Sequence, residues 1–393
     1  MSELDSMRDA IDEIDRQIVQ LFERRMNVTE QVGRFKQANH MPVLDNLRQK
    51  EVLASKAALL RDPDYRADVT MLYETIMGIS RQQQRKIVRE GAEEPNFARI
   101  QRALDTRREP VVDPVVAYQG EPGAYSEQAT VNFFGPDVKA QGLRQFEDVF
   151  LALRDGKADY GVVPVENNAT GAIRQIYDLL AEYEFSLVGE TTVRVEHCLC
   201  APEGASVDTI THVYSHEQGL FQSEQFLKQH PAWLPIPYLD TAGSGKYVAE
   251  TGDITKAAIC SERAAELYGL RILARSVNYS AINTTRFVVV SPKLELREGA
   301  DKISTVLTTP HESGCLHEIL GIFAVNGLNM VKLESRPIPG KSWEYMFFIE
   351  FTGNLTATGM DGVLRELSQT AAYFRVLGNF KSNLEERPCR ISI

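Results

Sequence analysis

Apolar residues in the first forty positions recur at alternating spacings of three and four, from Leu4 to Phe35. This heptad rhythm predicts one long amphipathic helix over residues 4–39, and its apolar stripe needs a partner to cover it. One charged residue, Arg25, falls on the stripe. Because a buried charge is costly unless it is paired, Arg25 is either a side chain that extends to solvent or part of an anion site inside a helical bundle.

Two more helices are predicted, over residues 46–60 and 66–88, and Asp45 is the expected N-cap of the first of them. On each helix, polar side chains share a face that is otherwise apolar. Together with Asp45 they are Arg48, Gln49, Ser80 and Gln84. Polar groups on the apolar faces of three helices predict a pocket in the core of an all-α domain, which we assign to residues 1–90.

The remainder of the chain predicts two further domains. Residues 91–113 are charged and lack a sustained stripe, which indicates a linker with room for one short helix. Short strand and helix patterns then alternate over residues 114–292, as is typical of an α/β domain with helices on a sheet. Over residues 302–385 the order is strand, helix, strand, strand, helix, strand, which predicts a ferredoxin-like α+β unit.

Polar residues cluster after two strand patterns of the α/β domain. Glu166, Asn167 and Asn168 follow one apolar run, and Ser215 begins a second cluster after another. Ligands of open α/β sheets bind at the carboxyl ends of strands, so both clusters supply candidate site residues.

Charge and composition narrow the range of partners. The chain of 393 residues has a formal net charge of −11. An acidic protein is poorly suited to the nucleic-acid backbone, so we expect no nucleic-acid partner. The sequence has no run of about 18 apolar residues, and its acidic N-terminus lacks the apolar stretch of a signal peptide. We therefore expect no membrane partner and a cytoplasmic location.

The cysteines do not indicate redox or metal chemistry. They are Cys198, Cys200, Cys260, Cys315 and Cys389. An odd and sparse set predicts reduced thiols. Cys198 and Cys200 stand beside His197, which invites a metal interpretation, but the alternation of this stretch favours a strand and no second ligand pair follows at zinc spacing. We expect no metal and no cofactor, so catalysis must depend on acid, base and hydrogen-bonding side chains.

Several longer motifs are specific enough to compare with known families. The α/β domain contains VVPVENNATGAI, VYSHEQGLFQ and NTTRFVVV; the N-terminal domain contains ERRMNVTEQVGRFK and the turn PVLD-x-x-R; the C-terminal unit contains LESRPIPGKSWEYMFF. With these motifs in this order, the sequence resembles the bifunctional chorismate mutase/prephenate dehydratases of bacterial phenylalanine synthesis. The resemblance implies a helical mutase domain, a two-lobed dehydratase domain similar to periplasmic binding proteins, and a ferredoxin-like ACT domain that senses phenylalanine.

In the helical domain the resemblance implies a chorismate pocket. Its residues would be Arg8, Arg25, Lys36, Asp45, Arg48, Gln49, Ser80 and Gln84. Arginines suit the substrate carboxylates, and Lys36 and Gln84 would be the catalytic donors to the ether oxygen. Arg8 lies about a quarter-turn off the face of Arg25, which fits a family arrangement in which this arginine enters the partner subunit's pocket, in a homodimer or a higher homo-oligomer. Gln49 departs from the family's usual glutamate; it can still accept a bond from the substrate hydroxyl, and its effect on the pH dependence is open.

In the α/β domain the resemblance implies a prephenate site. Thr285, in the motif Thr-Arg-Phe, would donate to the departing hydroxyl, and Glu166 is the alternative acid, unless it only caps the next helix. The expected pocket residues are Asn167, Ser215, Gln222 and Arg286. Arg286 would pair with a substrate carboxylate or bridge the two lobes.

In the C-terminal unit the resemblance implies a phenylalanine site between two such domains. Its residues would be Gly314, Leu316, Asn329, Glu334, Ser335, Arg336 and Pro337. His317 departs from the family's small-residue motif, which leaves the affinity open. Three alternatives compete with this reading: an ACT unit that only dimerises, a dehydratase whose helical domain is non-catalytic and only dimerises, and a ligand-binding module without turnover.

Overall fold

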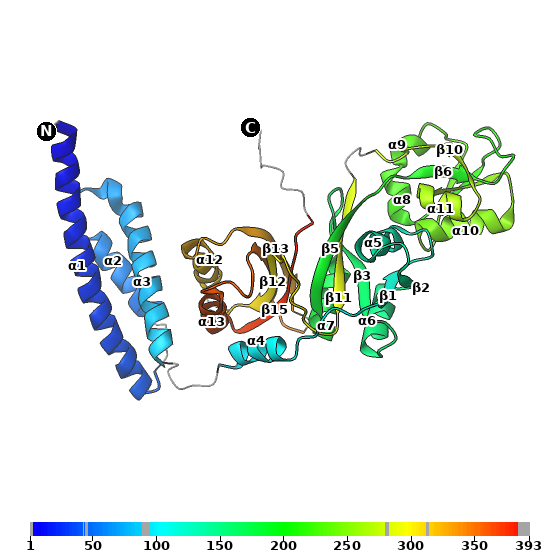
Figure 1. The fold of residues 1–393 in the computed structure, drawn as a ribbon. Helices are drawn as coiled ribbons and strands as arrows, with labels where there is room; N and C mark the ends of the chain where they lie inside the picture. Colours follow the sequence, from blue (N-terminus) through cyan, green and yellow to red (C-terminus); the bar gives the residue numbers. More distant parts are fainter. Residues whose placement is uncertain are drawn as a thin grey trace. The chain divides into compact units, whose positions relative to one another are not determined.

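A computed structural model describes residues 3–41, 43, 46–88, 94–279, 283–311, 314–338 and 340–383. The chain forms two compact units (Figure 1). The first consists of Met1–Ala98, Thr309–Val325 and Gly362–Tyr373, and the second of Arg99–Thr308, Asn326–Asp361 and Phe374–Ile393. The three domain boundaries expected from the sequence stay predictions, since this division groups the C-terminal sheet with the α/β segment.

The three N-terminal helices of the first unit are present as predicted. They are α1 (Glu3–Ala38), α2 (Asn46–Ala57) and α3 (Arg66–Val88). Between the last two, Pro63 opens a short 3-10 turn that Asp62 caps by accepting the Asp64 N–H. The backbones of α1 and α3 approach closely at Gly33, where an added Cβ would lie 3.0 Å from the Ile87 side chain. The expected cap Asp45 lies outside the described residues.

The apolar stripe of α1 is exposed along the whole helix. Its exposed fractions are 55–61% for Leu4, Met7, Ile11, Ile14, Ile18, Leu21, Val28 and Phe35, and 39% for Val32. The buried residues of α1 are Thr29 and Gly33. The prediction that the stripe needs a partner therefore still applies to the whole helix.

Helix α4 (Pro95–Asp105) lies inside the predicted linker, and the second unit, which begins within it at Arg99, continues into a two-lobed α/β domain. The first lobe has a sheet in the order β2-β1-β3-β11-β5, with β4 beside β3. Its strands are β1 (Val115–Gln119), β2 (Lys139–Leu143), β3 (Tyr160–Asn167), β4 (Gly171–Ala172), β5 (Ser186–Arg194) and β11 (Thr284–Ser291). Its helices are α5 (Tyr125–Phe134), α6 (Phe146–Arg154) and α7 (Arg174–Tyr183).

The second lobe has its own sheet, in the order β10-β6-β9-β7-β8. The strands are β6 (Cys198–Ala201), β7 (His212–Ser215), β8 (Leu234–Pro237), β9 (Lys256–Cys260) and β10 (Arg271–Ala274). The helices are α8 (Glu217–Gln222), α9 (Glu224–Leu227), α10 (Thr241–Thr251) and α11 (Glu262–Leu267). The predicted alternation is confirmed, and it missed β2 and β8. The chain passes between the lobes twice, after β5 and before β11.

The C-terminal segment has the predicted strand and helix order. It consists of β12 (Lys302–Thr308), α12 (Cys315–Val325), β13 (Met330–Pro337), β14 (Tyr345–Thr352), α13 (Met360–Thr370) and β15 (Tyr373–Phe380). The sheet order is β13-β14-β12-β15, and β14 is antiparallel to both of its neighbours. This is the α+β ferredoxin-like arrangement. None of the described helices is both long and apolar enough to cross a membrane.

Candidate active sites

The charged position on the helical stripe is turned into the bundle. The Arg25 guanidinium contacts the Ser80 hydroxyl and lies 3.5 Å from the Ile76 carbonyl oxygen, so α1 and α3 meet at a polar point. Burial lowers the pKa of Arg25 from its ordinary value, but an arginine remains charged. The solvent-reaching alternative for Arg25 is therefore not what the structure shows.

Other predicted mutase residues lie near the same helices. Lys36 Nζ donates to the Val43 carbonyl at 2.6 Å, which holds the residue after the helix break close to α1. The Gln84 carbonyl oxygen is buried and accepts no hydrogen bond from the described residues. An unsatisfied buried amide is costly, so Gln84 is ready to bond a ligand. The structure thus places the cations Arg25 and Lys36 on α1 and the Gln84 amide oxygen, without a bond from the described residues, on α3.

The departure at Gln49 has a structural counterpart that the sequence analysis missed. Arg81 Nη1 donates to Gln49 Oε1 at 3.2 Å, and its Nε bonds Glu318 at 3.1 Å. Arg85 bonds the other oxygen of Glu318 at 2.5 Å. A glutamate at position 49 would form an ion pair with Arg81. Gln49 is uncharged and accepts an ordinary hydrogen bond from Arg81 instead.

Two other arginines predicted for the mutase pocket, Arg8 and Arg48, are exposed. Arg8 has a side chain that is 67% exposed, and it lies 3.9 Å from Asp5. The 17 residues from Arg8 to Arg25 correspond to about 25 Å along a helix. Arg48 is also exposed and bonds Glu51 at 3.2 Å. Within one chain, Arg8 is therefore too far along α1 to contribute to the Arg25 site.

In the dehydratase domain, strands β3 and β11 pair side by side and present two different faces. Thr285 is the register partner of Asn167, and Arg286 is the partner of Glu166. Successive side chains of a strand point to opposite faces of the sheet. Thr285 and Asn167 therefore share one face, and Arg286 and Glu166 share the other.

Asn167 is the anchor of the first face. Its Oδ1 accepts the backbone N–H groups of Ala169 at 2.9 Å and Thr170 at 3.2 Å. This fixes Nδ2 as the donor, and it bonds Asn283 Oδ1 at 2.7 Å and Thr285 Oγ1 at 2.9 Å. Because the Thr285 oxygen already accepts, its own proton remains to be donated, and no described residue takes it. Thr285 thus has a hydroxyl proton available to a ligand, and its role as the donor stays a prediction.

The same chain of bonds crosses to the second lobe. Asn283 Nδ2 donates to Gln222 Oε1 at 2.9 Å, and His197 Nε2 lies 3.1 Å from the same oxygen. His197 Nδ1 lies 3.1 Å from the Tyr125 hydroxyl, which also reaches the Glu196 carbonyl at 2.8 Å. Since Gln222 Oε1 is an acceptor, His197 must carry its proton on Nε2. Both passages of the chain between the lobes are joined by this network.

Burial sets the protonation of the network. It lowers the pKa of His197 to about 4, although the hydrogen bond that His197 donates to Gln222 raises it, so the imidazole is neutral at pH 7. Burial likewise raises the pKa of the Tyr125 hydroxyl well above its ordinary value. Both ring nitrogens of His197 are occupied by Tyr125 and Gln222, so the metal interpretation of His197, Cys198 and Cys200 has no free imidazole ligand to use. Cys198 and Cys200 lie in β6, as predicted.

Ser215 is fully buried but belongs to a different set of contacts. It ends β7, and its hydroxyl donates to the Ile259 carbonyl at 2.7 Å. An added Cβ on Gly219 would lie 2.5 Å from this hydroxyl, so the serine and the glycine of the motif require each other. Ser215 is placed at the expected strand end, outside the network that contains Asn167, Thr285 and Gln222.

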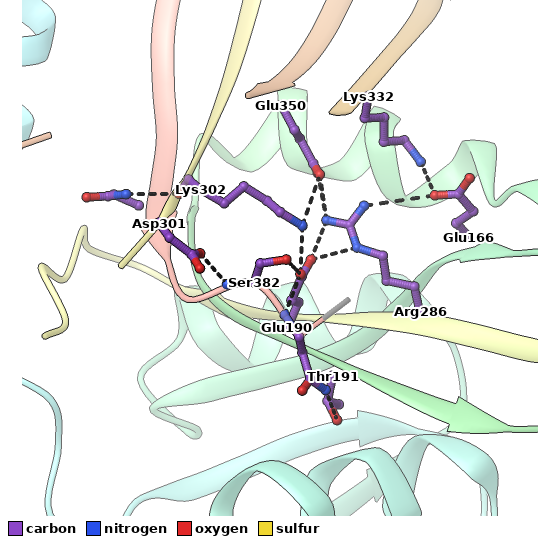
Figure 2. Close-up of polar contacts among 11 residues, drawn as sticks. Glu166, Glu190, Thr191, Arg286, Asp301, Lys302, Lys332, Glu350 and Ser382 are labelled. Carbon is purple, nitrogen blue, oxygen red and sulfur yellow. Dashed lines mark hydrogen bonds and ion pairs between the residues drawn. The ribbon is translucent and has the colours of Figure 1, made fainter. Parts of the chain in front are cut away.

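The second face holds Arg286 and Glu166 in ion pairs, as Figure 2 shows. Arg286 Nε donates to Glu190 at 2.7 Å and Nη2 donates to both oxygens of Glu350 at 2.8 and 2.7 Å. Its side chain is 7% exposed. Glu166 bonds Lys332. Strand alternation directs both side chains away from Thr285, and their expected roles as substrate ligand and alternative acid stay predictions.

The residues expected to bind phenylalanine do not all fall in one unit. Residues 334–337 form the end of β13, and Asn329 precedes that strand. Among them Arg336 donates to the carboxylate of Asp178 on α7 at 2.7–3.1 Å. Gly314, with a φ of 87°, and Leu316 at the start of α12 belong to the first unit.

The depressed pKa of His197 predicts a pH-dependent stability. The unfolded chain takes up a proton near the ordinary pKa of 6.5, whereas the folded chain does so only near pH 4. Between these values the unfolded state binds more protons, so the free energy of unfolding falls as the pH drops. We expect a contribution of about 2 kcal/mol between pH 7 and pH 5. Denaturant unfolding should show this loss in the wild-type chain and a smaller loss in His197→Gln; equal slopes in both would contradict the assignment.

Comparison with known proteins agrees with this geometry. The family model for prephenate dehydratase matches residues 116–295, and that for chorismate mutase type II matches residues 7–85. The bifunctional chorismate mutase/prephenate dehydratase of Escherichia coli strain K12 is 32% identical over 389 residues, which cover 96% of each chain.

Two solved structures match about two thirds of the chain. The prephenate dehydratase of Arthrobacter aurescens, in complex with L-Phe, is 29% identical with a TM-score of 0.63, over 68% of this chain and 90% of that one. A structure described as GqqA, a novel type of quorum quenching acylase, is 31% identical with a TM-score of 0.62, over 68% and 98%. These two descriptions name different activities, so the match to the full-length relative carries the identification.

The fold and the two sites define a class of enzyme in which a helical mutase domain precedes a two-lobed dehydratase domain. The chain belongs to the bifunctional chorismate mutase/prephenate dehydratase family.

Proposed function

We propose that this chain converts chorismate to prephenate in its helical domain and prephenate to phenylpyruvate in its two-lobed domain, in the cytoplasm, under feedback inhibition by phenylalanine. The observation that carries the proposal is the buried network in which Thr285 is held with its proton free for a ligand. The match to a bifunctional relative over 96% of both chains supports the pairing of the two activities.

The mutase reaction needs a shaped, charged cavity and no proton transfer. Chorismate rearranges through a pericyclic transition state in which negative charge grows on the ether oxygen. Arg25 can hold one substrate carboxylate, and Lys36 and Gln84 can donate to the ether oxygen. Gln49 with its partner Arg81 can orient the substrate hydroxyl. The first of these roles agrees with the half-buried position of Arg25 beside Ser80.

The dehydratase reaction needs help for a departing hydroxide. As the ring carboxylate leaves as CO₂, its bonding electron pair enters the ring and expels the hydroxyl group, which a proton converts to water. Thr285 would donate a hydrogen bond to this leaving oxygen, and Asn167 would keep Thr285 oriented by donating to its Oγ1. The side chains of Asn283 and Gln222 extend this support into the second lobe.

The test is one assay with chorismate. We expect phenylpyruvate to appear by its ultraviolet absorbance, with prephenate detected in a parallel trapped sample. A chain that converts added prephenate but not chorismate would support the alternative of a non-catalytic helical domain. A chain that binds either compound without turnover would support the ligand-binding module. Phenylalanine should lower the rate from prephenate and should bind in calorimetry, with Gly314, Leu316, Asn329 and residues 334–337 as its proposed ligands.

The exposed stripe of α1 supports a homodimer or a higher homo-oligomer, in which Arg8 completes the partner subunit's mutase pocket. A mixture of Arg8→Ala and Arg25→Ala proteins should then regain mutase activity after subunit exchange, because a hybrid dimer contains one pocket with both arginines intact. The measurement is chorismate turnover before and after exchange, with exchange checked by differently tagged chains. Verified exchange without any gain in activity would exclude the shared pocket.

A further inference from the structure

The side chains next to the two dehydratase residues are bound by the C-terminal sheet. Glu166 precedes Asn167 on β3, and its carboxylate bonds Lys332 of β13. Arg286 follows Thr285 on β11, and its guanidinium bonds both oxygens of Glu350 on β14. Figure 2 shows both contacts meeting around the Arg286 guanidinium, whose Nη1 is 3.9 Å from Glu166.

This cluster is balanced in charge, and four of its six members are deeply buried. Besides Glu166, Lys332, Arg286 and Glu350 it contains Lys302 and Glu190. The exposed fractions of the side chains are 1% for Glu190, 2% for Lys302, 7% for both Arg286 and Glu350, 11% for Lys332 and 42% for Glu166. Three cations face three carboxylates, so the loss of any one member leaves a charge without its counterion. Ions this deeply buried hold their geometry closely, because an unpaired buried charge is costly.

Lys332 is the member whose position depends most directly on β13. Its Nζ lies 5.5 Å from the centre of the Tyr177 ring. Burial alone would lower the pKa of Lys332, but Tyr177 and Glu166 together raise it above its ordinary value, so the ammonium group stays charged. Lys332 is two residues before Glu334 and therefore shares its face of β13.

Neighbouring residues of a strand are joined by a planar peptide, so a shift of one moves the other. A displacement of Glu166 or Arg286 by the C-terminal sheet must turn the peptides that carry Asn167 and Thr285. Catalytic hydrogen bonds are sensitive to such shifts, since a misplacement of about 1 Å can cost about 10²-fold in rate.

We propose that Lys332 and Glu350 are positioning residues for the dehydratase reaction, acting on Asn167 through Glu166 and on Thr285 through Arg286. This inference rests on the proposed dehydratase function. The same contacts supply a route for feedback control. A ligand that binds at residues 334–337 and prefers one position of β13 would shift Lys332. By linkage, that ligand would favour one arrangement of β3 and β11.

The experiment replaces Lys332 in the full-length chain. Lys332→Met should lower kcat for prephenate about tenfold and leave KM within about twofold, because Asn167 and Thr285 are displaced rather than removed. We define the residual activity as the rate at saturating phenylalanine divided by the rate of the same protein without phenylalanine. This fraction should be larger in Lys332→Met than in the wild type, while calorimetry still detects phenylalanine binding. Lys332→Arg keeps the charge and should recover most of kcat.

A matched control is available in the second lobe. Lys256 also lies over a tyrosine ring, at 5.4 Å from the centre of Tyr247, and is paired with Asp253 at 3.6 Å. Lys256→Met therefore removes the same kind of lysine without touching β3 or β11. Equal kcat and equal phenylalanine inhibition in Lys332→Met and Lys256→Met would overturn the proposal.

Glu166 offers a second variant in case Lys332→Met does not fold. The Glu166 side chain is 42% exposed, so its substitution should disturb folding less. Glu166→Gln should lower kcat by about the same factor as Lys332→Met, and the double variant should be no worse than either, as for two residues that act as a pair. A far larger loss in Glu166→Gln alone would return Glu166 to the role of acid and overturn the proposal. Failure of the proposed function is distinguishable, since the wild-type chain itself would then leave prephenate unconverted.

Discussion

Replacing Thr285 with alanine is expected to lower prephenate turnover by about 10²-fold or more, the usual scale for a positioned donor. The Thr285 oxygen is held by Asn167 Nδ2 at 2.9 Å, and its proton has no acceptor among the described residues. Alanine removes that proton donor and changes nothing in the anchor of Asn167, which is made by backbone N–H groups. Chorismate should still be consumed, with prephenate accumulating.

The measurement is the rate of phenylpyruvate formation from added prephenate. Thr285→Ser keeps the hydroxyl and should retain much of the rate. Thr284→Ala is the matched control, because Thr284 is the adjacent residue of β11 and points to the other face. Near-normal phenylpyruvate formation in Thr285→Ala, or an equal loss in Thr284→Ala, would remove the donor role from Thr285.

Arg25→Ala is expected to abolish measurable chorismate turnover. The guanidinium of Arg25 is turned into the bundle against Ser80 of α3, and alanine leaves no cation at that point to bind a substrate carboxylate. A charge-assisted bond that is lost from a buried site is among the largest single losses that a substitution can cause. Dehydratase activity on added prephenate should survive.

The adjacent arginine provides the control for Arg25. Arg24 is exposed on the same helix, so Arg24→Ala changes the net charge equally and should keep chorismate turnover. Circular dichroism of both variants checks that the bundle is folded. If Arg25→Ala loses both activities together, the residue is structural and the mutase pocket lies elsewhere.

Hydrophobic periodicity was sufficient to predict the three helices of the N-terminal domain. A charged residue on a heptad stripe is visible in the sequence, and the structure confirms that Arg25 points into the bundle. The environment of position 49 was not predictable, because its partner Arg81 is 32 residues away and the second partner of Arg81, Glu318, is 237 residues from Arg81. Such a contact depends on how distant segments pack, and no local pattern records it.

Strand alternation shows the same division in the dehydratase domain. The period of two already places Glu166 opposite to Asn167, and Arg286 opposite to Thr285. It does not say which face a ligand meets, so the roles expected for Glu166 and Arg286 stay predictions. The signal for Asn283 was present at the start of the NTTRF motif, whereas His197 was considered only as a metal ligand.

The sequence by itself determined most of the helices and strands and the family, and it indicated Arg25, Asn167 and Thr285 as candidate site residues, because periodicity and motif spacing are properties of neighbouring residues. Only the tertiary structure decided which partners these residues have. The network from Asn167 to Tyr125 joins segments on both passages between the lobes, and the ion cluster joins β3, β5 and β11 to β12, β13 and β14. Those contacts are set by the packing of sheets that are distant in sequence, where burial makes each unpaired charge or amide costly and so selects one arrangement.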